Sequence, residues 1–304
     1  MRLQFVLKYQ ESGPVPEHKT SALRGGMGQM LLRMFCVCRD NQAVECESCL
    51  CRRRCIVQNI MYAPFKIKPD FVTEGESAGF RIYCCDKKQY VREGDNLSFE
   101  MILFGDMMAY FNPILQAVHA LGIEGLGREH VPFSIETVYN QLGDKIVDGM
   151  DVHMEYLLLE SIDDFVRKRK AELKNCDTIR LSFNVPCDIR FHGQIQREFS
   201  PEPVFQAAYR RLYMASLFEG INIERVWDPD NAEAITYEQS SRRMGLKRYS
   251  GRKEEKINLY GIAGWMDMQN VSEEAVEVLL VGELTGIGKN IKFGMGNYRV
   301  EGKK

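Results

Sequence analysis

The sequence contains no apolar run long enough to cross a bilayer, and its 304 residues carry a net charge of only −2. A bilayer-spanning helix needs about 20 mostly apolar residues, so no membrane segment or membrane partner is expected. The near-neutral charge means that any nucleic-acid site must be a local basic patch. Residues 2–9 alternate in polarity and include a charge, unlike a signal peptide, so a cytoplasmic location is expected.

Two familiar phosphate-binding motifs are also missing. No Gly-x-Gly-x-x-Gly follows a first strand and opens a helix, and no Gly-Lys-Ser/Thr closes a phosphate-binding loop. Histidine is scarce, with five residues in the chain, so few side chains are available for proton transfer near neutral pH.

Cysteine, by contrast, is plentiful: the chain has ten, and six lie between positions 36 and 55. In a cytoplasmic protein they are expected to be thiols or metal ligands rather than disulfides. Cys46 and Cys49 have the C-x-x-C spacing that places two thiolates on one tetrahedral ion. We predict a structural zinc in preference to free thiols or an iron–sulfur cluster, with Cys51 as the spare thiol. The predicted ligands are Cys36, Cys46, Cys49 and Cys55, with Cys38 as the alternative to Cys36.

The hydrophobic pattern predicts a similar succession of strands and helices in the two halves. In the first half, strands are expected at 2–9, 79–84, 97–104 and 132–139, with helices at 20–35 and 107–121. In the second half, strands are expected at 178–185, 255–265 and 297–300, with helices at 203–218 and 272–281. This order is typical of ferredoxin-like folds. We therefore predict an α+β protein with two tandem ferredoxin-like domains, 1–170 and 171–304, the first with a cysteine-rich insertion at about 36–60.

The first predicted helix contains three glycines, Gly25, Gly26 and Gly28. Each costs a helix roughly 1 kcal/mol relative to alanine, which favours a position where another backbone or a ligand approaches closely. Thr20 or Ser21 is the expected N-cap, because a hydroxyl can accept a hydrogen bond from a free amide of the first turn.

Near the C-terminus, two Gly-x-Gly pairs enclose two lysines and a phenylalanine in the segment 286–296. Glycine permits positive φ angles and close approach. Exposed backbone amides together with Lys289 and Lys292 would form a cradle for phosphate oxygens. A glycine-rich hairpin without a ligand is the alternative.

A second basic stretch lies at 242–253, where six arginines and lysines surround Tyr249. This composition suits phosphate contacts and base stacking, and with Lys289 and Lys292 in the same half it favours RNA. A solvated loop is the alternative.

These features occur in a specific order. A Leu-Arg-Gly-Gly-Met-Gly helix (23–28) precedes the cysteines, and Arg248-Tyr249-Ser250, the Gly261–Gly264 strand and the two Gly-x-Gly pairs follow in the second half. The order resembles the CRISPR-associated endoribonucleases of the RAMP superfamily, which act in antiviral defence.

The resemblance implies RNA lying across two ferredoxin-like domains and metal-independent cleavage of precursor CRISPR RNA within its repeats. The ribose 2′-hydroxyl would attack the adjacent phosphate, leaving 2′,3′-cyclic phosphate and 5′-hydroxyl ends. Partners would be the repeat RNA and CRISPR effector or adaptation proteins.

The family often places a catalytic histidine on or just before the first helix, which points to His18, with His192 as the second candidate. Lys289 or Arg248 would supply positive charge, and Tyr249 a hydrogen bond or a stacking face. The implied RNA contacts are Arg24, Arg248, Arg252, Gly286, Gly288, Lys292, Gly294 and Gly296.

One feature departs from the family. Relatives with this C-terminal signature often have a histidine just before the Gly-Lys of the loop, whereas residues 284–289 contain none. A non-catalytic module that holds CRISPR RNA within an effector complex is therefore the alternative function. A zinc-stabilised protein-interaction domain unrelated to RNA is the third.

Overall fold

The computed structural model describes the whole chain except residues 39–48, 70–71, 73–78, 224–233, 251–254 and 304. Contacts divide it into two compact units. The first comprises 1–159 with 218–220 and 249–255, and the second comprises 160–217, 221–248 and 256–304. The boundary expected at 170/171 lies within helix α4 (Ile162–Glu172), and the functional domain limits stay a prediction.

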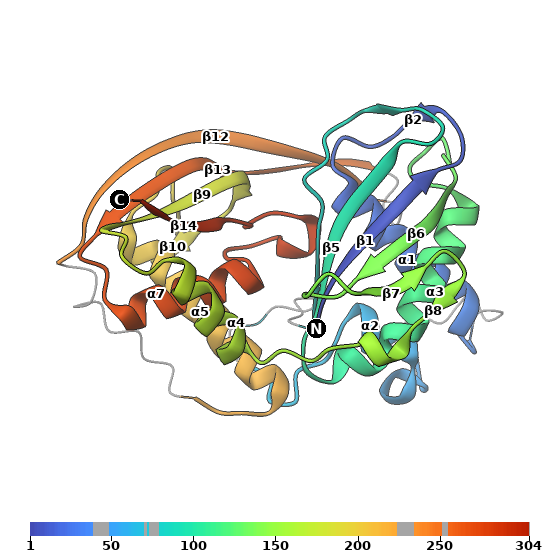
Figure 1. The fold of residues 1–304 in the computed structure, drawn as a ribbon, viewed down its shortest axis with the longest axis horizontal. Helices are drawn as coiled ribbons and strands as arrows, with labels where there is room; N and C mark the ends of the chain where they lie inside the picture. The colour runs from blue at the N-terminus through green and yellow to red at the C-terminus, as the bar shows by residue number, and fades with distance from the viewer. Residues whose placement is uncertain (39–48, 70–71, 73–78, 224–233, 251–254, 304) are drawn as a thin grey trace. The chain divides into compact units, whose positions relative to one another are not determined.

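The first unit is a six-stranded antiparallel sheet in the order β3-β5-β1-β6-β7-β8 (Figure 1). Its main elements are β1 (Arg2–Tyr9), α1 (Lys19–Phe35), β3 (Phe80–Tyr83), β5 (Asn96–Leu103), α3 (Phe111–Glu124) and β6 (Phe133–Tyr139). Smaller elements are β2 (Gly13–Pro14), η1 (Arg52–Arg54), α2 (Ile56–Met61), β4 (Tyr90–Val91), η2 (Gly105–Tyr110), β7 (Lys145–Asp148), β8 (Asp151–Val152) and η3 (Met154–Tyr156).

The sheet of this unit has one apolar face because its strands alternate. Leu3, Phe5 and Leu7 of β1 are fully buried, while the residues between them are polar or partly exposed. Phe5 stacks on Phe99 of β5 with ring centroids 4.8 Å apart. The period-2 pattern of 2–9 therefore predicts both the strand and its buried side.

Two of the three glycines in α1 are explained by helix packing. A Cβ on Gly26 would lie 2.4 Å from the Leu121 side chain of α3, and one on Gly28 would lie 2.6 Å from Met61 of α2. Gly25 faces open space, with no atom within 4 Å of such a Cβ. The close approach is thus by neighbouring helices.

The expected N-cap of α1, Thr20 or Ser21, is wrong by two or three residues. The N-cap is His18, which has extended backbone angles and no side-chain capping bond. Thr20 is not a cap because its hydroxyl instead accepts a hydrogen bond from the amide of Cys84 at 3.2 Å. This tertiary hydrogen bond uses the hydroxyl that the sequence pattern assigned to capping the helix.

The second unit repeats the arrangement with a four-stranded sheet in the order β12-β13-β9-β14 (Figure 1). Its elements are α4, β9 (Thr178–Cys187), β10 (Arg190–Phe191), β11 (Gln194–Ile195), α5 (Pro201–Glu219), β12 (Thr236–Ser250), β13 (Glu255–Gln269), α7 (Glu273–Thr285), η4 (Ile291–Phe293) and β14 (Arg299–Lys303). Ser272 caps α7 by accepting a hydrogen bond from the amide of Ala275.

The two sheets share one topology. In each, the second, third, first and fourth strands of the strand–helix–strand–strand–helix–strand unit lie in that spatial order, as β3-β5-β1-β6 and β12-β13-β9-β14. This is the ferredoxin-like arrangement, so the predicted fold is confirmed. None of the helices in the described ranges combines the length and the apolar character that crossing a membrane requires.

The basic stretch at 242–250 is a strand and not a loop, because it forms the second half of β12. Leu246 is buried at 2% exposure, and the neighbouring Gly245 and Lys247 are exposed. The alternation of buried and exposed residues therefore continues through the basic part of the strand.

Candidate active site and nucleic-acid interface

His18 occupies the point where the chain enters α1. Its side chain is only 13% exposed, and its Nε2 lies 3.9 Å from Oε1 of Glu17. Burial lowers the pKa of His18, with Lys87 and Lys19 acting in the same direction and Glu17 opposing them. The positive end of the helix dipole also disfavours the imidazolium. The neutral imidazole, which can accept a proton, is therefore the form held near neutral pH.

The segment that carries His18 is fixed by a buried lysine. Lys19 is fully buried, and its ammonium lies 2.7 Å from the carboxylate of Asp86. It also donates to the carbonyls of Lys88 at 2.6 Å and Pro16 at 3.1 Å. These bonds connect the chain on either side of His18 to residues 86–88, so the imidazole stands on a rigid support. A lysine in a polar stretch gives no sequence signal for this role.

The glycines of the C-terminal loop all have positive φ angles: 71° at Gly286, 78° at Gly288, 90° at Gly294 and 72° at Gly296. A Cβ on Gly288 would lie 2.5 Å from the carbonyl oxygen of Asp188, and one on Gly296 would lie 1.9 Å from that of Ile287. The glycines are thus required for the loop to fold on itself and on the end of β9.

The backbone amides of this loop are largely used within the protein. Ile287 donates to the carbonyl of Gly296, Gly296 donates to Pro186 and Lys289 donates to Asp188, each at 2.9 Å. These amides are not available to a phosphate in this conformation, in contrast to the cradle expected from the sequence. RNA contacts by the four glycines stay a prediction.

Side chains from the loop and from β12 do form a cationic group. The Arg248 guanidinium lies 3.8 Å from the centroid of the Phe293 ring, and the Lys292 ammonium lies 5.3 Å from the same centroid. Burial lowers the pKa of Arg248, and its buried Nε has no hydrogen-bond partner among the described residues. Two cations therefore lie around one ring, and contacts of Arg248 and Lys292 with RNA phosphates stay a prediction.

The other predicted RNA and catalytic residues lie in different settings. Lys289 is exposed on the loop, and Tyr249 is exposed at the end of β12. Arg24 donates to the carbonyl of Met61 at 2.8 Å and lies over the Phe80 ring, so it supports the packing of α1. Arg252 lies outside the described residues.

His192, the second histidine candidate, is at the tip of the β10–β11 hairpin. It is exposed, has a φ of 47° and contacts the ring of Phe191. The structure thus places it in a turn that solvent surrounds, whereas His18 is held in a partly desolvated position.

The cysteine-rich segment brings together Cys38, Cys49 and Cys51, whose sulfurs lie within 4.8 Å of one another. The Cys38 and Cys49 sulfurs are 3.5 Å apart. Tetrahedral zinc with Zn–S bonds of about 2.3 Å separates its sulfurs by about 3.8 Å, so this cluster could hold a metal ion. It shares Cys49 with the predicted set. Cys36 and Cys55 are not part of it, and Cys46 lies outside the described residues.

Comparison with known protein families identifies both halves of the chain. Residues 1–156 match the model named AF_1859_N, an N-terminal domain. Residues 181–298 match the CRISPR-associated endoribonuclease Cas6 model. The first match covers more than half of the chain, so the protein belongs to that family, and the second match assigns residues 181–298 to a Cas6 endoribonuclease domain. The resemblance inferred from the sequence is confirmed. No curated protein gave a significant sequence match.

Solved structures share the fold at low sequence identity. A chain of a partial Cas6-RT-Cas1–Cas2 complex has a TM-score of 0.60 at 13% identity, with 99% of this chain and 46% of that one covered. A Cas6 product complex has a TM-score of 0.53 at 19% identity, covering 99% and 100%. Cas6 from Thermus thermophilus has a TM-score of 0.52 at 12% identity, covering 99% and 97%. The chain therefore spans less than half of the first structure and nearly all of the other two.

Proposed function

We propose that this protein cleaves precursor CRISPR RNA within its repeats, without a metal ion, by attack of a ribose 2′-hydroxyl on the adjacent phosphate. The observation that carries the proposal is the Cas6 endoribonuclease domain at 181–298 within a double ferredoxin-like chain. A solved Cas6 product complex that shares this fold is consistent with it.

The reaction needs a base at the 2′-hydroxyl, an acid at the leaving 5′-oxygen and positive charge near the phosphorane. His18 suits the base because its lowered pKa keeps the imidazole neutral. Arg248 and Lys292 around Phe293 supply positive charge for RNA phosphates, and exposed Lys289 and Tyr249 are further contacts. His192 remains the second candidate for proton transfer.

The test is an incubation of the purified protein with repeat RNA transcribed from the host's CRISPR array, in excess EDTA. Cleavage at one position in each repeat, with cyclic phosphate and 5′-hydroxyl ends, is expected. Tight, salt-sensitive binding without any product would favour the non-catalytic RNA-holding module instead.

The lowered pKa of His18 predicts a particular pH dependence of cleavage. Because a general base must be unprotonated, the single-turnover rate should be flat above neutrality and fall at acid pH, with half-maximum below 6.5. The charged neighbours of His18 determine how substitutions shift the pH at which the rate is half-maximal. Lys87→Ala removes a positive charge and should move the half-maximum to higher pH, whereas Glu17→Gln should move it to lower pH.

Rates measured between pH 5 and 8.5 for the three proteins would check this prediction. A half-maximum above 7 in the wild type, or shifts of the same sign in both variants, would contradict the assignment of His18 as the base.

We also propose that Cys38, Cys49 and Cys51 hold a structural zinc that fixes the segment between α1 and α2. The sulfur separations support this assignment, and a thiolate set without other ligands suits zinc. Cys36, Cys46 and Cys55, the other members of the predicted set, are the residues to vary in search of a fourth ligand. An iron–sulfur cluster is the alternative.

Zinc should be stoichiometric with the purified protein by elemental analysis. Cys49→Ser should lose most of the metal and lower the melting temperature, since binding free energy at such a site contributes to folding. Cys85→Ser changes an exposed cysteine outside the cluster and serves as the control. Wild-type protein without zinc, or Cys49→Ser with full zinc, would contradict this site.

A further inference from the structure

One face of the first unit's sheet carries a row of four cross-strand neighbours. Tyr83 of β3 is opposite Glu100 of β5, Glu100 is opposite Gln4 of β1, and Gln4 is opposite Tyr139 of β6. Residues directly opposite each other in antiparallel strands point to the same face. This row is therefore on the side away from the buried Leu3 and Phe5. Two aromatic rings flank a carboxylate and an amide.

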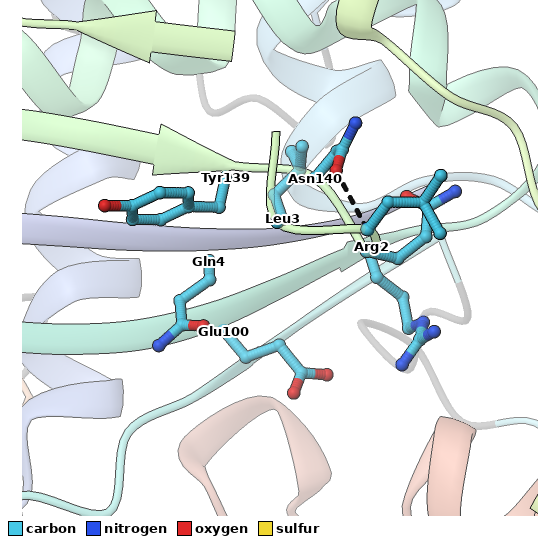
Figure 2. A pocket seen from close by; sticks show the side chains of 9 residues that line it. Arg2, Leu3, Gln4, Glu100, Tyr139 and Asn140 are labelled. Carbon is cyan, nitrogen blue, oxygen red and sulfur yellow. Dashed lines mark hydrogen bonds between the residues drawn. The ribbon is translucent and has the colours of Figure 1, made fainter. Parts of the chain in front are cut away.

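The sheet is hollowed at this row. A cavity of about 500 Å³ is lined by Gln4, Glu100 and Tyr139, by Arg2, and by the turn that follows β6. Figure 2 shows the Tyr139 ring, the Gln4 amide and the Glu100 carboxylate arranged along neighbouring strands beside the cavity. The volume falls in the range of small-ligand sites.

The turn that forms one wall of the cavity is rigid. The Asn140 carboxamide oxygen accepts from the amides of Leu142 and Asp144, and its nitrogen donates to the carbonyl of Tyr156 at 3.0 Å. The wall is thus fixed before any ligand arrives, which lowers the entropic cost of binding.

Three polar side chains of the cavity are available for a ligand. Across the described part of the chain, the side chains of Gln4, Glu100 and Tyr139 make no hydrogen bond or ion pair. The carboxamide oxygen of Gln141, also in the lining, is buried and lacks a hydrogen-bond partner among the described residues.

We propose that this cavity binds a guanine base of single-stranded RNA. The ionised carboxylate of Glu100 accepts hydrogen bonds only, and the Watson–Crick edge of guanine presents two adjacent donors, N1–H and the N2 amino group. Gln4 can donate to O6 from its amide nitrogen while the base stacks on the Tyr139 ring. Arg2 also lines the cavity and adds positive charge there.

The carboxylate is what selects guanine. Adenine has an acceptor, N1, at the centre of its Watson–Crick edge, and cytosine has N3 there, so each would set a lone pair against Glu100. Uracil offers a single donor between two carbonyls. The inference rests on the proposed RNA function and adds to it a sequence preference at a site built from the first unit alone.

The experiment measures binding of fluorescein-labelled octanucleotides to the full-length protein by anisotropy. The RNAs are all uridine, or uridine with one central guanosine, inosine or adenosine. The guanosine RNA should bind about tenfold more tightly than the other three, a typical discrimination for a bidentate contact. Inosine differs from guanosine only in lacking the N2 amino group, so this comparison tests the contact to Glu100 without altering the protein.

Variants then locate the site. Glu100→Gln should bind the guanosine and inosine RNAs equally, while Glu155→Gln, which removes an equally charged but exposed side chain of the same unit, should keep the preference. Guanosine and inosine RNAs of equal affinity in the wild type would overturn the proposal, as would a preference that persists in Glu100→Gln. Cleavage of repeat RNA in EDTA is scored separately. Cleavage without a guanine preference would leave the proposed function intact and refute only this site.

Discussion

His18→Ala should lower the single-turnover rate of repeat-RNA cleavage by about 10² to 10⁴-fold, the usual contribution of a positioned proton-transfer group. The side chain is 13% exposed and stands where α1 begins. Its supporting lysine, Lys19, is bonded to Asp86 and two carbonyls and would be unchanged by the substitution. The loss should therefore be in the rate and not in folding.

The measurement is cleavage of labelled repeat RNA with enzyme in excess, together with the affinity for RNA and the free energy of unfolding. His192→Ala is the matched comparison, because it removes an imidazole from an exposed hairpin tip in the second unit. It should cleave at close to the wild-type rate. If His192→Ala stopped cleavage and His18→Ala did not, the two roles would have to be exchanged.

Gly296→Ala should destabilise the protein by about 3 kcal/mol, a large change for one methyl group. Gly296 has a φ of 72°, which an alanine rarely adopts, and the added Cβ would lie 1.9 Å from the carbonyl oxygen of Ile287. Both the amide and the carbonyl of Gly296 are hydrogen-bonded, to Pro186 and Ile287 respectively. The loop cannot move away from the clash without breaking them.

Urea denaturation of the variant would measure the effect, and Gly25→Ala is the control. Gly25 lies in α1 with nothing within 4 Å of an added Cβ, so alanine there should raise stability by up to about 1 kcal/mol. RNA affinity of Gly296→Ala should also fall, because the loop positions Lys292 and Phe293 next to Arg248. A variant as stable as the wild type would show that the loop does not depend on this conformation.

Much of the fold could be predicted from the sequence because its main elements have strong periodic signals. The alternation in 2–9 and 178–185 and the helical spacing in 20–35 and 203–218 all correspond to observed elements. The ferredoxin-like fold predicted from the succession of strands and helices also fixes the spatial order of the strands in each sheet. The basic stretch was missed as a strand because its arginines and lysines mask the period-2 pattern that Leu246 continues.

The site was predicted less completely, because its geometry depends on contacts between distant residues. The glycine pattern at 286–296 indicated positive φ angles correctly, yet it did not reveal that the carbonyls of Pro186 and Asp188 take the loop's amides. Nor did any local signal mark Lys19 as a buried support for His18.

The row of Tyr83, Glu100, Gln4 and Tyr139 lies on four strands between positions 4 and 139, so only the register brings it together. The cysteines likewise show that residue spacing alone does not predict which side chains meet, here within a short segment of the chain. The C-x-x-C spacing drew attention to Cys46 and Cys49, whereas the chain path around Cys38 and Cys51 determines which sulfurs meet.

The central claim is that the RNA's own 2′-hydroxyl performs the cleavage, and one substrate tests it directly. Two repeat RNAs are compared in EDTA, one unmodified and one with a single 2′-deoxynucleotide immediately 5′ of the mapped cut. The account predicts that the unmodified RNA is cut once, leaving a 2′,3′-cyclic phosphate, and that the deoxy-substituted RNA is bound equally well and left intact. Cleavage of the deoxy-substituted RNA at the same position would contradict it.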